Sequence, residues 1–285
     1  MSESKDKAVR GYCMYDWGKS AFETSVTAAI LPPWFAYLFL EANGLTTTLA
    51  GIEFSGSAMW SYSIALATLL VALVSPSLGV IADRRKIKMW WLRILTYLGA
   101  GSTVLLALAG TNMIPISMKW AWLLIMFVFA NIGLNGAGVF YNALLPHLGD
   151  NEDMDEISNK AFAYGYIGGA LLLVFHLYLV MGVGGDWVIP FCMASSGIWW
   201  LGFSMLTFKW VPEPPIENEL EKMNFKDTTI FAFKEVASTL SKRKDFRTLF
   251  FFMFAYFLYI DGINTITAIA GIFGPVVLGL TTTDL

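Results

Sequence analysis

Seven long apolar segments, separated by shorter polar connections, dominate the pattern of the chain. Each is long enough to cross a lipid bilayer as a helix, which takes about 20 mostly apolar residues. Helices satisfy their own backbone hydrogen bonds in lipid, whereas open strands do not. The pattern therefore predicts seven transmembrane helices, at 16–40, 58–82, 89–110, 118–145, 161–183, 187–208 and 248–272.

Two adjacent prolines, Pro32 and Pro33, interrupt the first of these segments. Proline lacks a backbone donor and ends most helices in water. In a membrane, neighbouring groups can satisfy the carbonyls that a proline leaves unpaired. We therefore expect one kinked helix over 16–40.

The composition favours lipid over water as the surroundings of the chain. Hydrophobic residues make up 56% of the 285 residues and charged residues 14%, whereas soluble domains carry about 25% charged residues. The net charge is −3, and the basic residues form no face that could follow a phosphate backbone. We expect the lipid bilayer as a partner and no nucleic acid.

Little in the sequence indicates a metal site or a catalytic site. Cys13 and Cys192 lie far apart and form no metal-binding motif. His147 and His176 lack a second ligand or a nucleophile at the usual spacing. We therefore expect no metal, no cofactor and no enzymatic activity, and a membrane-embedded enzyme is the weakest of the hypotheses.

Lysine and arginine gather in three polar segments: the N-terminus, the connection at 84–88 and the segment 209–247. All three fall on one side of the membrane if the helices alternate, and such segments are typically cytoplasmic. The connection at 146–160 falls on the same side but is acidic, and acidic residues contribute little to orientation. The N-terminus is therefore predicted to be cytoplasmic, in a bacterial or archaeal plasma membrane.

The one long polar segment, 209–247, divides the chain into unequal parts. It opens with prolines at 212, 214 and 215 and has mixed charge, so we expect a cytoplasmic linker with an interfacial helix around 225–241. The predicted organisation is a six-helix bundle at 1–208, the linker at 209–247 and the start of a second bundle at 248–285. Because one helix of a second bundle is an unusual place to stop, we expect the natural chain to continue beyond Leu285.

The helix at 16–40 carries three ionisable residues, Asp16, Lys19 and Glu23. Charges inside a membrane are costly and mark either a pathway or a buried pair. Lys19 is spaced to pair with Glu23 and with Asp16 on neighbouring turns. Asp16 and Lys19 could instead lie at the membrane interface, whereas Glu23 lies deeper and is expected to face a cavity.

Two further helices carry polar residues within long apolar sequence. Asn131, Asn135 and Asn142 share one face of the helix at 118–145, where they either join neighbouring helices or line a solute path. Asp261 and Asn264 lie in the helix at 248–272. A carboxylate at that depth either takes up a proton or pairs with a cation, so we favour a functional role for Asp261.

The end of the helix at 58–82 carries a G-x-x-x-D-R pattern followed by basic residues: Gly79, Asp83, Arg84, Lys86 and Lys88. Glycine permits close approach of another backbone, and the aspartate can pair with the neighbouring arginine or cap a facing helix N-terminus. An ordinary basic loop is the simpler interpretation, but the spacing in this connection favours a specific motif.

The G-x-x-x-D-R pattern resembles the signature between the second and third helices of major facilitator superfamily transporters. Three segments are similar to the vacuole-effluxer branch of that superfamily, which includes the autophagy-related amino-acid exporters: YDWGKSAF at 15–22, FYNALLP at 140–146 and AYFLYIDG at 255–262. Lys19 stands where that branch usually has asparagine, and the glycine that usually follows the Asp-Arg pair is absent.

The resemblance implies an all-α membrane protein, with a six-helix major-facilitator N-terminal bundle plus a seventh transmembrane helix from an incomplete C-terminal bundle. The family fold has two six-helix bundles with the solute site between them, and its first, fourth and seventh helices line the cavity. The resemblance also implies that Asp83 and Arg84 form a cytoplasmic gate against the missing C-terminal bundle.

We therefore predict a secondary active transporter that moves a small polar solute by alternating access, and the resemblance suggests amino acids. Glu23 or Asp261 would couple transport to protons. The alternative is a seven-helix receptor or sensor without transport activity. That alternative requires an extracellular N-terminus, and a retinal protein would also need a lysine in the seventh helix, which 248–272 lacks.

Overall fold

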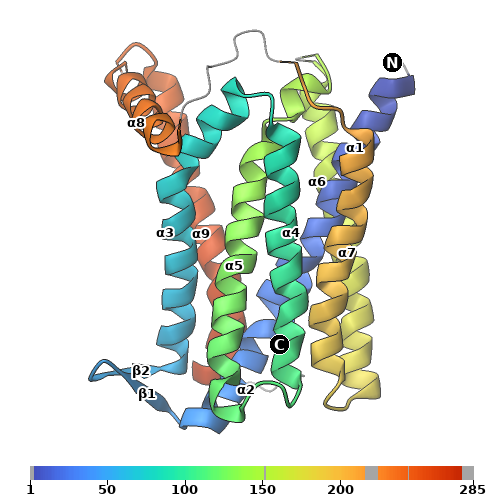
Figure 1. The fold of residues 1–285 in the computed structure, drawn as a ribbon, viewed down its shortest axis with the longest axis vertical. Coiled ribbons are helices and arrows are strands. Elements are labelled where there is room, and N and C mark those ends of the chain that lie inside the picture. Colours follow the sequence, from blue (N-terminus) through green and yellow to red (C-terminus); the bar gives the residue numbers. More distant parts are fainter. Residues whose placement is uncertain (1–2, 151, 216–223, 243, 278–285) are drawn as a thin grey trace.

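The computed structural model describes residues 3–150, 152–215, 224–242 and 244–277, and most of them are helical. The long helices run side by side along the longest axis of the molecule (Figure 1). Six of them are long and apolar enough to cross a membrane: Glu3–Asn43, Gly56–Arg84, Lys88–Gly110, Ile116–His147, Met154–Val183 and Val188–Trp210. The predicted all-α, multi-pass membrane fold is therefore confirmed.

The helical elements follow the predicted order along the chain. They are α1 Glu3–Ala21, η1 Phe22–Ile30, α2 Leu31–Asn43, α3 Gly56–Arg84, α4 Lys88–Leu106, η2 Ala107–Gly110, α5 Ile116–Asn142, η3 Leu145–His147, α6 Met154–Tyr178, η4 Leu179–Val183, α7 Val188–Trp210, α8 Phe225–Ser241 and α9 Arg247–Val277. The helix expected around 225–241 is α8, and the seventh apolar segment forms α9.

The first helix is longer than the predicted 16–40, because α1, η1 and α2 join into one helix from Glu3 to Asn43. It continues through Pro32 and Pro33, as expected, but the nine residues before them are π-helical, with the N–H of Leu31 donating to the carbonyl of Val26. A proline ring clashes with the carbonyl four residues before it. A wider π turn gives that carbonyl room, so the helix does not end there.

α6 begins at Met154, earlier than the predicted start at 161. Asp155 and Glu156 lie in its first turn, where acidic side chains interact favourably with the helix dipole. The acidic connection predicted at 146–160 is therefore partly helical.

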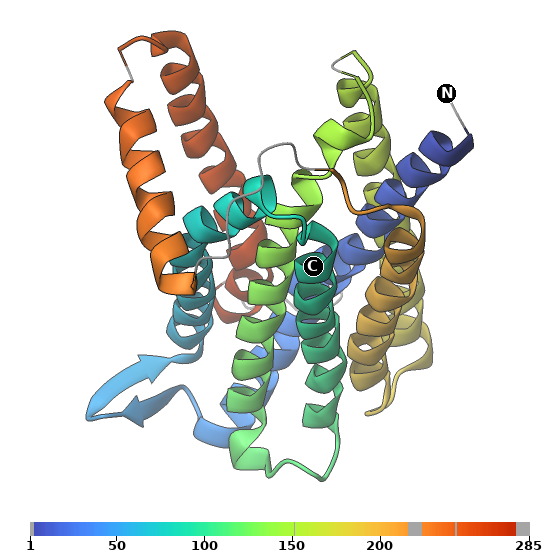
Figure 2. The same cartoon turned by 45° about the horizontal axis from the view of Figure 1, so that its top comes forward.

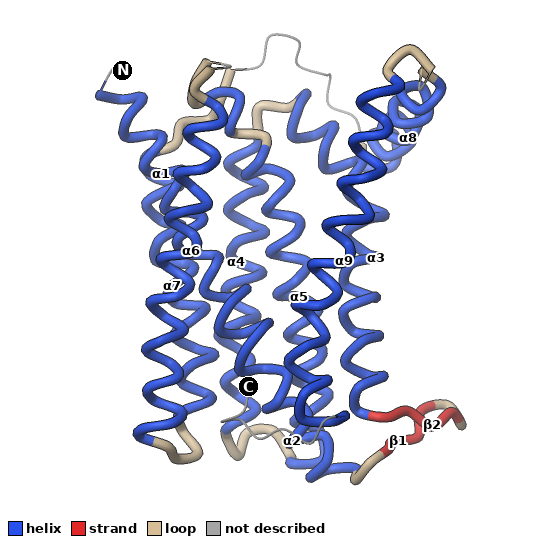
Figure 3. The backbone as a smooth tube through the Cα atoms, turned by 180° about the vertical axis from the view of Figure 1, so that it is seen from behind, coloured by secondary structure: helices blue, strands red, loops and turns tan. Residues whose placement is uncertain are grey.

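A β-hairpin that the hydropathy pattern did not predict connects α2 to α3. Its strands, β1 Thr46–Leu49 and β2 Ile52–Ser55, pair antiparallel. Ala50 and Gly51 form the two-residue turn with φ angles of 51° and 80°, which are the left-handed values that a tight hairpin turn requires. The hairpin lies at the opposite end of the bundle from α8 (Figure 3).

Aromatic side chains fill the core between the helices. Trp60 of α3 stacks on Phe127 of α5 with ring centroids 4.6 Å apart, and Phe22 of η1 lies 5.7 Å from Trp200 of α7. Trp60 and Trp200 are fully buried. Stacked and tilted aromatic pairs add to the packing that holds helices together where lipid supplies no hydrophobic drive.

The outer faces of the helices remain apolar. Along α3, four leucines have exposed fractions between 40% and 56%: Leu66, Leu69, Leu70 and Leu73. Soluble monomers rarely expose continuous apolar surface of this kind, whereas hydrocarbon tails cover it in a membrane.

The last two helices lie at one edge of the bundle. Figure 2 shows α8 and the adjoining end of α9 as neighbours beside α3, and α9 continues along α3, α2 and η1. Ser77 Oγ of α3 donates to Thr229 Oγ1 of α8 at 2.9 Å, so the linker helix is attached to the bundle.

Candidate functional site

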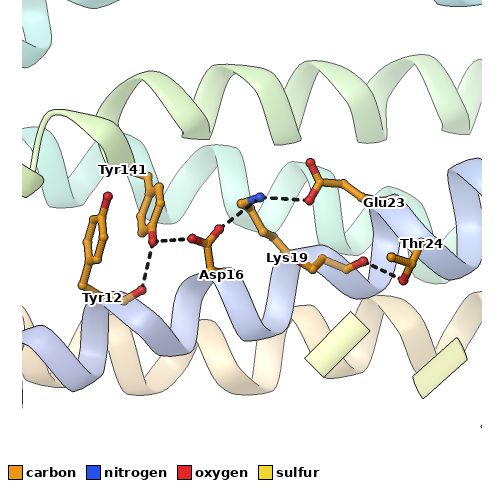
Figure 4. Close-up of polar contacts among 7 residues, drawn as sticks. Tyr12, Asp16, Lys19, Glu23, Thr24 and Tyr141 are labelled. Atoms are coloured by element: carbon orange, nitrogen blue, oxygen red, sulfur yellow. Dashed lines mark hydrogen bonds and ion pairs between the residues drawn. The ribbon is translucent and has the colours of Figure 1, made fainter. Parts of the chain in front are cut away.

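A charged triad lies on the first helix, where α1 passes into η1 (Figure 4). Lys19 Nζ lies 3.1 Å from Asp16 Oδ1 and 2.9 Å from Glu23 Oε2. Both predicted pairs therefore form at once, with one cation shared by two carboxylates. Formally the triad carries one negative charge in excess.

A tyrosine of α5 completes the surroundings of Asp16. The hydroxyl of Tyr141 donates to Asp16 Oδ2 at 3.0 Å and lies 3.2 Å from the carbonyl oxygen of Tyr12. The ring of Tyr141 also stacks on Tyr12 and Tyr15, with centroids 4.1 and 4.8 Å apart. Asp16 is thus bound through both of its oxygens, to Lys19 and to Tyr141, and is fixed in place.

The two carboxylates differ in exposure. The side chain of Asp16 is 7% exposed and that of Glu23 is 45% exposed. The only ion pair or hydrogen bond that the described residues give Glu23 is the one between Oε2 and Lys19. The structure therefore divides the triad into a buried carboxylate, Asp16, and a half-exposed one, Glu23.

Close packing of α6 fixes the helix that carries the triad. Thr24 Oγ1 donates to the carbonyls of Ser20, at 2.8 Å, and of Gly169, at 3.2 Å. A Cβ atom added at Gly165 would lie 2.8 Å from Ser20 Oγ, and one at Gly168 would lie 2.6 Å from the carbonyl oxygen of Trp17. Only glycine permits this approach, so the packing of α6 on the first helix depends on these small residues.

The asparagines of α5 do not join neighbouring helices in the hydrogen bonds that the structure gives them. Asn131 Nδ2 donates to the carbonyl of Phe127 at 3.0 Å, and Asn135 Nδ2 donates to that of Asn131 at 2.9 Å. Asn135 and Asn142 are exposed. Bonds one turn back along the same helix leave the carbonyl ends of Asn131 and Asn135 for other partners, and a role of these residues in lining a solute path stays a prediction.

Asp261 lies on α9 with its side chain exposed. No hydrogen bond or ion pair joins it to the triad within the described part of the chain. The side chain of Asn264 lies outside the described residues. The structure therefore brings together the polar residues of the first helix and Tyr141 of α5, and leaves Asp261 separate.

The G-x-x-x-D-R motif makes different contacts from those expected. A Cβ atom at Gly79 would meet nothing within 4 Å, so the close backbone approach expected there is not made in the described structure. Arg84 Nη2 lies 3.7 Å from Glu235 Oε1 of α8, with both side chains 43% exposed. Asp83 and Lys86 are exposed, and the pairing of Asp83 with Arg84 is not among the ion pairs of the described residues.

Glu213, just beyond α7, caps the N-terminus of α4. Its carboxylate accepts the backbone N–H groups of Lys88, at 2.7 Å, and Met89, at 2.9 Å, in the first turn of α4. A carboxylate at a helix N-terminus satisfies unpaired donors and interacts with the dipole. Lys88 is buried, and its Nζ lies 2.9 Å from His147 Nε2. No local sequence pattern pairs these residues, so the sequence alone did not reveal them.

The N-terminal turn of α1 is tied to the start of α6. Lys5 Nζ lies 3.0 Å from Asp153 Oδ2. This hydrogen bond, together with the backbone N–H of Asp150, lowers the pKa of the Asp153 carboxyl below its usual value. The pair is solvent-exposed, so its contribution to stability is small. It joins the N-terminal turn of the first helix, which begins well before the predicted position, to the loop before α6.

Comparison with known proteins gives one family and several relatives. The family described as "Vacuole effluxer Atg22 like" matches residues 4–285, which confirms the resemblance seen in the sequence. The Uncharacterized MFS-type transporter YxiO of Bacillus subtilis is 28% identical over 278 residues, covering 94% of this chain and 60% of that protein. Autophagy-related protein 22 of Yarrowia lipolytica is 25% identical over 134 residues, covering 41% of this chain and 23% of that protein.

A further relative, Autophagy-related protein 22 of Botryotinia fuckeliana, is 29% identical over 140 residues, covering 44% of this chain and 23% of that protein. No solved structure matches the chain. The chain thus spans 60% of the length of YxiO and less of the fungal relatives.

Proposed function

Because the chain belongs to the vacuole effluxer Atg22-like family, we propose that it forms part of a secondary active transporter that moves a small polar solute across a membrane. Amino acids are the solute class that the resemblance implies. YxiO, which resembles the chain over most of its length, is described as an MFS-type transporter. The activity of the whole protein is part of this proposal, since the chain spans only 60% of YxiO.

The observation that carries the proposal is the triad on the first helix. A charge inside a membrane is rare and faces either the interior of a bundle or a water-filled cavity. Glu23 keeps half of its side chain exposed while bound to Lys19. The ammonium group of an amino acid would replace Lys19 at Glu23, and its carboxylate would then bind Lys19. Because a zwitterionic amino acid carries no net charge, this exchange leaves the net charge of the site unchanged.

Transport would follow from movement of two bundles around this site. In the proposal, residues 1–208 form one bundle, 209–247 the linker and 248–285 the start of the second bundle. Arg84, which contacts the linker helix, and the neighbouring Asp83 would form the gate at that end. Glu23 or Asp261 would couple transport to protons.

Uptake of radiolabelled amino acids into proteoliposomes tests the proposal with Glu23→Gln. We expect kcat/KM for uptake to fall by about 10- to 150-fold, because a hydrogen bond to a charged group contributes about 1.5–3 kcal/mol. Glu41→Gln is the matched control, since Glu41 is exposed at the end of α2, and it should keep full uptake.

Wild-type protein that takes up no amino acid, or equal uptake by both variants, would refute the proposed site. The same assay across a range of pH separates the candidate coupling groups. Asp261→Asn should abolish the pH dependence if Asp261 carries the proton, and an unchanged profile removes that role from Asp261.

A further inference from the structure

An open cleft lies at the start of α9, directly after the loop that follows α8. Its volume is about 560 Å³, and it is lined by Lys244, Arg247, Phe250, Phe251 and Phe254. Ligand sites occupy about 300–1,000 Å³, so the cleft is large enough for part of a small amphiphile. None of its residues belongs to the charged triad.

The lining of the cleft is cationic at one end and aromatic at the other. Lys244 and Arg247 are exposed, and the Arg247 guanidinium lies 5.4 Å from the centre of the Phe251 ring. Arg247 is also the first residue of α9, so the unpaired N–H groups of that helix end add positive potential. Such a lining fits a ligand with an anionic head and an apolar tail.

The sequence around the cleft indicates its depth in the membrane. Arg247 directly precedes the apolar run of α9, and Phe251 and Phe254 in that run are 61% and 62% exposed. Basic residues at the end of a membrane helix lie at the headgroup level, while apolar residues one turn further lie among acyl chains. The two cations would therefore meet phosphates, and the aromatic rings would meet lipid tails.

The neighbouring helix α8 has the features of a helix lying on a membrane surface. It is foreshortened in Figure 1, so it runs across the bundle rather than along it. Thr228 and Ala232 are buried, whereas Ile230, Phe233 and Val236 form an exposed apolar stripe on another face, with exposed fractions of 42–45%. Amphipathic surface helices insert such a stripe into the headgroup region, which again places this corner of the molecule at the lipid surface.

We propose that the cleft binds an anionic phospholipid, with the phosphate between Lys244 and Arg247 and an acyl chain along Phe250, Phe251 and Phe254. A zwitterionic lipid offers the same tail without net negative charge, so the cleft should select phosphatidylglycerol over phosphatidylcholine. This inference does not depend on which solute is transported.

Native mass spectrometry of the protein released from nanodiscs of equal phosphatidylglycerol and phosphatidylcholine tests the proposal. The wild type should retain phosphatidylglycerol preferentially. In Lys244→Gln/Arg247→Gln the apparent affinity for that lipid should fall about thirtyfold, because each of the two side chains that would bind the phosphate in the cleft contributes about 1 kcal/mol. Lys226→Gln/Lys234→Gln removes the same charge from α8 without touching the cleft and should have little effect.

A second variant, Phe251→Ala/Phe254→Ala, keeps both cations and removes the aromatic wall. This variant should also weaken phosphatidylglycerol retention. If the cleft bound only free phosphate, loss of the aromatic rings would leave binding unchanged. Elution as a single peak in size-exclusion chromatography confirms that each variant is folded. Equal loss in the α8 control, or unchanged retention in both cleft variants, would overturn the proposal.

Discussion

Lys19 balances two carboxylates at the same time, and its own side chain is only 19% exposed. Without it, Asp16 would keep the hydrogen bond from Tyr141 but would lose its only cation among the described residues. An intact buried ion pair adds little to the free energy of unfolding. Removing one partner lowers that free energy strongly, because the other charge then stays buried without a counter-charge.

We predict that Lys19→Met lowers the free energy of unfolding by about 3 kcal/mol, measured by thermal or denaturant unfolding in detergent micelles. Adding Asp16→Asn should restore most of this loss, because the uncompensated charge then disappears. Lys119→Met is the control. Lys119 lies near the start of α5, and its replacement should change stability by no more than about 0.5 kcal/mol. Equal stability of wild type and Lys19→Met would contradict the interpretation of the triad as a coupled unit.

The ion pairs of the triad were predictable because the three residues lie within two turns of one helix. Lys19 reaches Asp16 and Glu23 across single turns, and this follows from helix geometry alone. Tyr141, Glu213 and His147 were not predictable as partners, because each lies far along the chain from the group it contacts. Long-range pairs of this kind depend on how the helices pack, which no local pattern specifies.

At the scale of elements, hydropathy and length predicted every long helix of the described chain, and the amphipathic pattern predicted α8. The differences arise where short-range chemistry overrides hydropathy. Two prolines follow a π-helical segment in the first helix, and the first turn of α6 carries acidic residues that favour an earlier helix start. The β-hairpin carries a two-residue turn at Ala50 and Gly51, and hydropathy does not detect such a turn.

The contact between α1 and α6 depends on glycine. Two glycine-to-alanine substitutions, one inside this contact and one outside it, test that dependence. A Cβ atom at Gly168 would lie 2.6 Å from the backbone oxygen of Trp17, whereas one at Gly138 of α5 would meet nothing within 4 Å. Gly168→Ala must therefore push the helices apart. Gly138→Ala only exchanges a poor helix former for a good one.

We expect Gly168→Ala to destabilise the protein by about 2 kcal/mol, as overpacking does. Gly138→Ala should be neutral or stabilising by up to about 1 kcal/mol. Unfolding transitions of the two variants in the same detergent measure the difference. If both substitutions had the same effect, the close approach of α1 and α6 would not be the feature that holds the triad in place.

At the scale of the whole molecule, two kinds of exposed surface lie within the membrane-spanning region. One is apolar and covers α3 with leucines such as Leu69, which is 56% exposed. The other carries Glu23, whose side chain is 45% exposed. Leu69 and Glu23 have similar exposed fractions but opposite polarity. We therefore expect lipid around the leucines and a water-filled solute path beside the carboxylate. The cytoplasmic location of the N-terminus stays a prediction from the basic connections.

Reaction of single introduced cysteines with a membrane-impermeant, water-soluble thiol reagent in nanodiscs distinguishes these two surroundings most directly. Cys13 and Cys192 are fully buried, so they should not react with the reagent. Because the reagent attacks the thiolate, which forms only in contact with water, Glu23→Cys should react at least about tenfold faster than Leu69→Cys. Thr48→Cys in the exposed hairpin gives the rate for open water. A rate at Glu23→Cys equal to that at Leu69→Cys would mean that the triad faces lipid, and it would contradict the solute path on which the proposed transport depends.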